Sequence, residues 1–190
     1  MVILVSGIFL WAGAHWIKRL LPELRSGMDA RLGKAAARGV IAGLMVLAIV
    51  MMVKGYSGAP WVEVYTPFNG ARHLNNLLML FAVILLGMGK SKGRMRTWFR
   101  HPMLTGVTVW AVAHLLVNGD LASIVLFGGL GIWAFVSRIL INRNEGVWNR
   151  PEAGPVSGDI RLLVIAAVLF AVIAAIHIWM GYNPFTGAMA

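Results

Sequence analysis

The sequence predicts an all-α membrane protein, a bundle of about six transmembrane helices. Of its 190 residues, 59% are hydrophobic and 13% are charged, whereas soluble domains carry about a quarter charged residues. The mean hydropathy is +0.76. The apolar residues gather in six runs, each close to the roughly 20 residues that a helix needs to cross a bilayer. Residues 1–190 are therefore interpreted as a single transmembrane domain.

The six apolar segments follow one another with clear helix boundaries. Pro102 opens the fourth segment, at a position where its missing N–H has no helical partner to lose. Only Asn118, Gly119 and Asp120 separate the fourth segment from the fifth, and Asp120 is suited to cap the fifth helix. We place the segments near residues 2–20, 37–54, 72–89, 102–118, 121–140 and 161–181.

The basic residues predict an orientation. Fifteen of the 17 Lys and Arg residues lie in the alternate loops 18–38, 90–100 and 138–161. By the positive-inside rule these loops are cytoplasmic, so both termini are periplasmic in a bacterial inner membrane. The first span has no basic residues before it, which indicates a signal anchor rather than a cleaved signal peptide. The net charge of +10 therefore fits the lipid bilayer as partner and not nucleic acid.

Two connections have a distinct composition. Residues 56–70 are aromatic and nearly uncharged, which predicts a lid or belt at the outer membrane interface. Residues 142–159 are polar and rich in Gly and Pro, which predicts a cytoplasmic linker.

One ten-residue pattern occurs twice. Residues 6–15 and 105–114 both follow [S/T]-G-x-x-[L/V]-W-A-x-A-H, with Gly, Trp and His four apart and hence on one helix face. The two copies run in opposite directions, as in a 3+3 inverted pseudo-repeat. His15 then lies roughly 6 Å inward of the bilayer midplane and His114 a similar distance outward.

The paired histidines favour a flat cofactor held between two helices. Neutral imidazole is a good axial ligand for haem iron, and its other N–H can be oriented by an acceptor. The chain has no cysteine, which excludes disulfides, thiolate ligands and covalent haem attachment. A haem is a flat group that suits such a pair, although either histidine taken singly is more often a hydrogen-bonded residue on an Ala/Gly packing seam. The predicted site has metal ligands His15 and His114, walls Trp11 and Trp110, and room for the ring at Gly7 and Gly106.

Other polar residues suggest secondary roles. Arg72 and His73 open the third span at the outer side and are candidates for binding a haem propionate, a substrate head group or water. His101 is predicted at the cytoplasmic interface, and His177 in an outer aromatic belt. No carboxylate lies inside a span, so proton pumping and cation transport are not predicted.

The chain resembles the NnrU family over nearly its whole length. The resemblance rests on the first span ending at His15, on Arg72-His73-Leu74-Asn75, and on R-H-P-x-x-x-G-x-x-x-W-x-x-A-H ending at His114. The plant 15-cis-zeta-carotene isomerases share this domain and bind haem b between two histidines. The resemblance implies His15 and His114 as the ligands, with a redox role linked to nitric oxide and denitrification. Isomerisation of a carotenoid ranks second, because Ala111 stands where the isomerases carry a cysteine.

Two alternatives remain. The R-H-P entry into a membrane helix is similar to membrane methyltransferases, in which His101 and Pro102 would border S-adenosylmethionine. Leu104 replaces their usual tyrosine, and Glu145 and Glu152 are isolated rather than paired. The other alternative is a non-enzymatic assembly or accessory protein. The predicted partners are lipid and a hydrophobic small molecule or nitric oxide.

Overall fold

The computed structural model describes residues 1–186. This part is mainly helical, and an isolated β-bridge joins Glu63 to Asp120. Its helices are α1 (Val2–Leu20), α2 (Pro22–Leu32), α3 (Lys34–Ser57), α4 (Ala71–Met88), the short 3-10 helix η1 (Met95–Thr97), α5 (Pro102–Val117), α6 (Leu121–Glu145) and α7 (Val156–Trp179).

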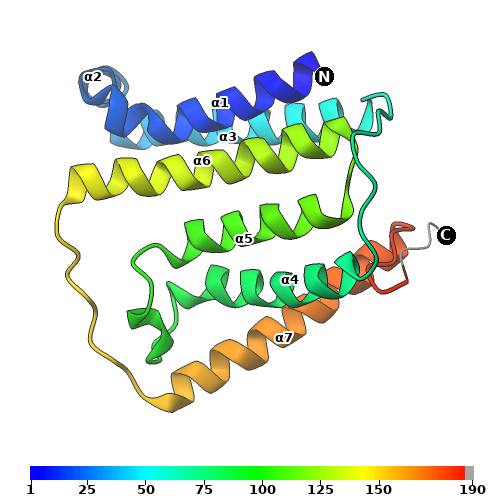
Figure 1. Ribbon diagram of the computed structural model, residues 1–190. Helices are drawn as coiled ribbons and strands as arrows, with labels where there is room; N and C mark the ends of the chain where they lie inside the picture. Colours follow the sequence, from blue (N-terminus) through cyan, green and yellow to red (C-terminus); the bar gives the residue numbers. More distant parts are fainter. Residues whose placement is uncertain (187–190) are drawn as a thin grey trace.

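The long helices lie side by side in one slab (Figure 1). Helix α1 packs against α3 and α6, α6 packs against α5, α5 against α4, and α4 against α7. Helix α6 therefore lies between the two helices that carry the repeated pattern, α1 and α5. It is in a position to contact both histidines.

The helices confirm an integral membrane protein. Four of them, α3, α4, α6 and α7, are long and apolar enough to cross a bilayer. Large apolar side chains also cover the outside of the slab, such as Val164, Val168 and Val172 on α7. Helix α5 is apolar but has 16 residues, and α1 carries Lys18 and Arg19 in its last turn. The count of six spans and the 3+3 repeat therefore stay predictions.

The region predicted as a simple basic loop, residues 18–38, contains a helix. Helix α2 begins with Pro22 at its first turn and ends at Gly33, which has φ +79°. It is seen end-on in Figure 1, whereas α1 and α3 run across the view. None of its residues is buried. The sequence contains the proline and the glycine that start and stop this helix. A prediction of membrane spans does not include it, because a helix of 11 residues is too short to cross a bilayer.

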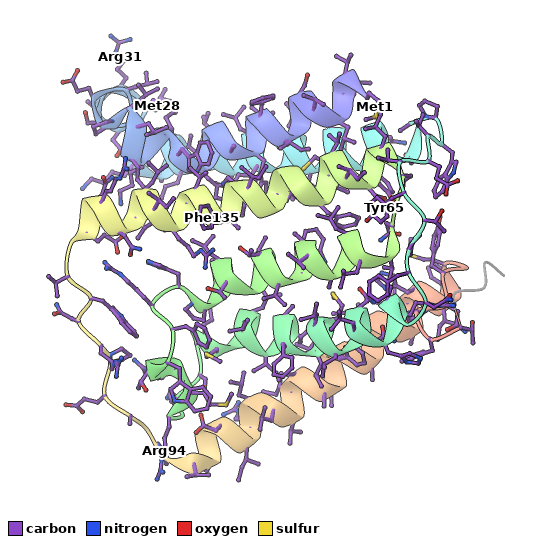
Figure 2. All side chains as sticks on the ribbon, viewed as in Figure 1. Met1, Met28, Arg31, Tyr65, Arg94 and Phe135 are labelled. Carbon is purple, nitrogen blue, oxygen red and sulfur yellow. The ribbon has the colours of Figure 1, made fainter. Side chains whose placement is uncertain are left out.

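The three basic segments lie at one end of the slab, here named the basic end. It contains α2, the connection from α4 to α5, and the linker from α6 to α7 (Figure 1). Arg31 on α2 and Arg94 beside η1 both lie there, and Tyr65 lies at the other end (Figure 2). Met1 and the end of α7 are also at this opposite end. The alternation of charge along the sequence thus becomes a charged end and a nearly uncharged end.

Residues 58–70 are anchored to the turn between α5 and α6. The Val64 N–H donates to the Gly119 carbonyl at 2.8 Å, and the Leu121 N–H donates to the Val62 carbonyl at 2.8 Å. Asp120 caps α6, as predicted, because its carboxylate accepts from the Ser123 N–H at 2.9 Å. The carboxylate also accepts from the Ser123 hydroxyl at 2.5 Å. Since Tyr56 on α3 is hydrogen-bonded to Ser123, this cap joins α3 to α6.

We expect Asp120→Ala to lower the unfolding free energy by about 2 kcal/mol, because it removes a helix cap and leaves the buried Ser123 hydroxyl without its acceptor. Thermal unfolding in detergent measures this. The control is Glu63→Ala, which removes an exposed acid at the same end. If Asp120→Ala and Glu63→Ala unfolded at the same temperature, the claim that the Asp120 cap stabilises the protein would be wrong.

Candidate functional site

His15 is held in one orientation by its own helix. Its Nδ1 lies 2.8 Å from the Trp11 carbonyl oxygen. A carbonyl can only accept, so Nδ1 carries the hydrogen and, in the neutral imidazole, Nε2 keeps its lone pair. The ring centroid lies 4.2 Å from that of Trp11 and 4.8 Å from that of Trp133 on α6.

His114 is held in the same way in the second copy. Its Nδ1 lies 2.9 Å from the Trp110 carbonyl oxygen. Its ring is 5.0 Å from Trp110 and is stacked on Phe127 of α6 at 4.4 Å. Each copy of the repeated pattern thus forms the same unit: a tryptophan carbonyl, an imidazole with a free Nε2, and an aromatic ring from α6.

The two units lie at different levels along α6. Phe127 and Trp133 are six residues apart, which corresponds to about 9 Å along a helix axis. Helices α1 and α5 run in opposite directions (Figure 1), so His15 lies toward the basic end and His114 toward the opposite end. Within residues 1–186, the ring contacts join each histidine to its own tryptophan and to α6, and none joins His15 to His114.

Two buried donors beside His15 have no acceptor. The indole N–H groups of Trp11 and Trp133 are buried and unpartnered, and Trp133 is only 7% exposed. By contrast, the nearby Trp16 donates to Ser137 at 2.8 Å. A buried donor without a partner costs about 1–3 kcal/mol. An ordered water, an ion or a bound molecule can supply the acceptor for such a group.

The two glycines of the pattern face neighbouring helices. A Cβ on Gly7 would lie 2.9 Å from the Met52 nitrogen of α3, and one on Gly106 would lie 3.1 Å from the Ala82 oxygen of α4. Their lack of a side chain lets α3 approach α1 and α4 approach α5. The space beside each glycine is filled by helix backbone rather than left for a ring, in contrast to the sequence-based expectation.

Arg72 and His73 are exposed at the start of α4. The Arg72 guanidinium donates to the backbone oxygen of Thr186, and Asn76 donates to that of Pro184 at 3.0 Å. This polar cluster therefore binds the segment after α7. The contacts of Arg72 do not bring it to either candidate ligand.

His177 shows which feature of the site is distinctive. Its Nδ1 lies 2.8 Å from the Ile173 carbonyl, so the bond to the residue four positions earlier is a general way to satisfy an imidazole on an apolar helix. Enclosure between two aromatic rings distinguishes His15 and His114. The rings from α6, Trp133 and Phe127, could not be found from the sequence, because the fifth segment shows no repeat that marks them.

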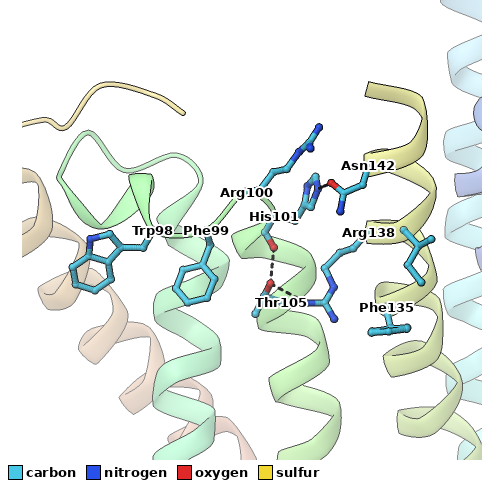
Figure 3. A pocket seen from close by; sticks show the side chains of 9 residues that line it. Trp98, Phe99, Arg100, His101, Thr105, Phe135, Arg138 and Asn142 are labelled. Carbon is cyan, nitrogen blue, oxygen red and sulfur yellow. Dashed lines mark hydrogen bonds between the residues drawn. The ribbon is translucent and has the colours of Figure 1, made fainter. Parts of the chain in front are cut away.

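A pocket of about 380 Å³ opens at the basic end (Figure 3). It contains Arg100 and His101 of the R-H-P motif, together with Arg138 on α6. No carboxylate lines it.

The family of the chain follows from a comparison with family models. The model described as NnrU protein matches residues 3–184. The chain belongs to the NnrU family. The matched region contains both histidine units and the R-H-P motif. No curated protein and no solved structure matches the chain.

Proposed function

We propose that this NnrU-family protein binds haem b, which His15 and His114 would hold, and serves a redox role linked to nitric oxide or denitrification. One observation carries the proposal. In both units an imidazole whose Nδ1–H is bound to a tryptophan carbonyl is enclosed between two aromatic rings, one of them from α6, which leaves Nε2 as the nitrogen that could bind a metal.

The chemistry of the residues present fits haem. Two imidazoles between aromatic rings offer nitrogen ligands in an apolar setting, and the chain has no thiolate to compete with them. The unpartnered indole N–H groups of Trp11 and Trp133 lie beside one of the ligands. They would donate hydrogen bonds to an acceptor on the bound group.

The residues around the ligands have distinct tasks. The carbonyls of Trp11 and Trp110 fix the tautomer and the rotation of each imidazole. Trp133 and Phe127, both on α6, cover the rings and exclude water. A rigid, dry ligand environment suits electron transfer, because little reorganises when the charge changes.

Haem supplies one-electron redox chemistry and an iron that binds nitric oxide. His15 and His114 would hold the group through their Nε2 atoms, and a pair of nitrogen ligands would suit electron transfer. Carotenoid isomerisation is the less favoured activity, because the chain has Ala111 in place of the cysteine of the plant isomerases. The basic end faces the cytoplasm of a bacterial inner membrane in this proposal.

The test is the visible spectrum of the wild-type protein, purified in mild detergent from haem-replete cells, with a pyridine haemochrome assay. We expect a Soret band and the haemochrome of a b-type haem, at about one haem per chain. A protein that stays colourless after incubation with haemin would contradict the proposal. The histidines would then be packing residues, as in an accessory protein.

A further inference from the structure

The pocket at the basic end is lined by hydrogen-bond donors that have no acidic partner. We name it the arginine pocket. Arg138 donates to the Thr105 hydroxyl at 3.4 Å and lies over the Phe135 ring at 5.2 Å, and Arg100 donates to the Gly146 carbonyl at 2.6 Å. A guanidinium has five N–H donors, so most remain available. The lining residues are Trp98, Phe99, Arg100, His101, Thr105, Phe135, Arg138, Ile139 and Asn142.

The ion pairs of the protein lie elsewhere. In the part of the chain that the structure describes, they join Arg19 to Glu145 and Arg25 to Asp29. Both arginines of the pocket are therefore without a carboxylate. These two unpaired positive charges line one partly buried pocket, and an anion bound there gains favourable Coulomb energy from both.

The neighbouring polar groups also favour an anion. His101 Nε2 lies 2.8 Å from Asn142 Oδ1, so it donates to this oxygen and leaves the amide nitrogen of Asn142 as a further donor (Figure 3). Helix α5 begins at Pro102, directly after His101, and its positive dipole end adds to the potential.

The rim of the pocket is apolar and exposed. Trp98 is 62% exposed and Phe135 is 53% exposed. Along α6, Ile132, Phe135 and Ile139 are all exposed and are spaced by three or four residues, so they form one strip that leads from the pocket toward the middle of the helix. A strip of this kind accommodates an acyl chain.

The depth of the pocket matches a lipid head group. Arg138 lies 17 residues after the first residue of α6, or about 26 Å along the helix. The hydrocarbon core of a bilayer is about 30 Å thick. A guanidinium at this depth lies close to the level of the lipid phosphates.

The segment before Arg100 is anchored to the start of α7. The Asp159 carboxylate accepts from the Met95 N–H at 2.9 Å and from the Arg94 N–H at 3.0 Å. Ser91 also donates to the Gly158 carbonyl at 3.3 Å. The wall of the pocket is therefore held in place before any ligand binds, which lowers the entropy cost of binding.

We infer that the arginine pocket binds the phosphate of an anionic membrane lipid, whose acyl chain lies along the Ile132–Phe135–Ile139 strip. This inference is independent of the proposed haem. It assigns the R-H-P segment, which haem ligation leaves without a role, to a lipid site.

The experiment measures the lipid that is retained by the full-length protein. The wild type, the double variant Arg100→Gln/Arg138→Gln and the control Arg143→Gln are each reconstituted in mixed phosphatidylglycerol and phosphatidylcholine, re-extracted in mild detergent and analysed by native mass spectrometry. Arg143 is exposed on the same helix end and does not line the pocket. We expect the double variant to retain about thirtyfold less phosphatidylglycerol, since each of the two arginines near the surface contributes about 1 kcal/mol. We expect Arg143→Gln to behave as wild type.

Two further measurements separate loss of the lipid site from misfolding and from binding of free phosphate. Arg138→Lys keeps the charge, so it should retain phosphatidylglycerol and shows that a loss is not misfolding. Equal retention by the wild type and the double variant would overturn the inference, and so would equal losses in the double variant and Arg143→Gln. If inorganic phosphate at millimolar concentration displaced the lipid completely, the pocket would be a site for free phosphate and not for a lipid.

Discussion

Replacing either candidate ligand is expected to remove the haem. We predict that His15→Ala and His114→Ala each lower haem occupancy by about tenfold or more, since loss of even an outer-shell partner costs roughly 10–100-fold in metal affinity. Each variant removes one of the two imidazoles whose Nε2 is free. The measurement is the haem-to-protein ratio from the pyridine haemochrome assay.

His177→Ala is the matched control for this prediction. It removes an imidazole with the same bond to a backbone carbonyl four residues earlier, from a helix outside the repeated pattern. We expect it to keep its haem. Full occupancy in His15→Ala together with a colourless His177→Ala would show that the ligand pair is wrong.

The second large effect is expected at the contact between α1 and α3. Gly7→Val should lower the unfolding free energy by about 3 kcal/mol or more, because the new Cβ would lie 2.9 Å from the Met52 nitrogen and 3.0 Å from the Ala48 oxygen. Backbone atoms cannot move aside as a flexible side chain can, so the two helices must separate. Thermal unfolding in detergent, followed by circular dichroism, measures the loss.

Gly13→Val provides the comparison, because it makes the same change on the same helix. No atom lies within 4 Å of a Cβ at Gly13, so we expect a change in unfolding free energy of less than about 0.5 kcal/mol. Similar losses in the two variants would mean that Gly7 does not set the distance between α1 and α3.

The sequence was sufficient to predict the long helices. All six predicted segments are helical, and the first agrees at both ends. Apolar runs, the cap at Asp120 and the proline at 102 are local signals, and local signals determine helix boundaries. Helix α2 was missed because it buries none of its residues and so has no apolar run.

Packing between helices was harder to predict. The repeated pattern indicated that Gly7, Trp11 and His15 share a helix face, but not which neighbour each one meets. In the structure Gly7 faces α3, whereas His15 meets Trp133 of α6. Both contacts depend on which helices are adjacent, and this is a tertiary property that no spacing within one segment reveals.

The arginine pocket illustrates the same limit. Its charged groups come from two places in the sequence, the R-H-P motif at residues 100–102 and Arg138 on α6. The R-H-P motif can be recognised in the sequence, but only the fold shows that it lies beside α6. Since Arg138 lies near the end of a membrane helix, the sequence alone placed it only among the basic residues of a loop.

The most direct test of the central claim is the electron paramagnetic resonance spectrum of the oxidised protein at low temperature. Two imidazole ligands give a strong ligand field, so the account predicts a low-spin ferric haem at about one per chain. Either single alanine variant should convert the residual haem to a high-spin form. A high-spin signal in the wild type, or a low-spin signal that persists in both His15→Ala and His114→Ala, would contradict ligation by these two histidines.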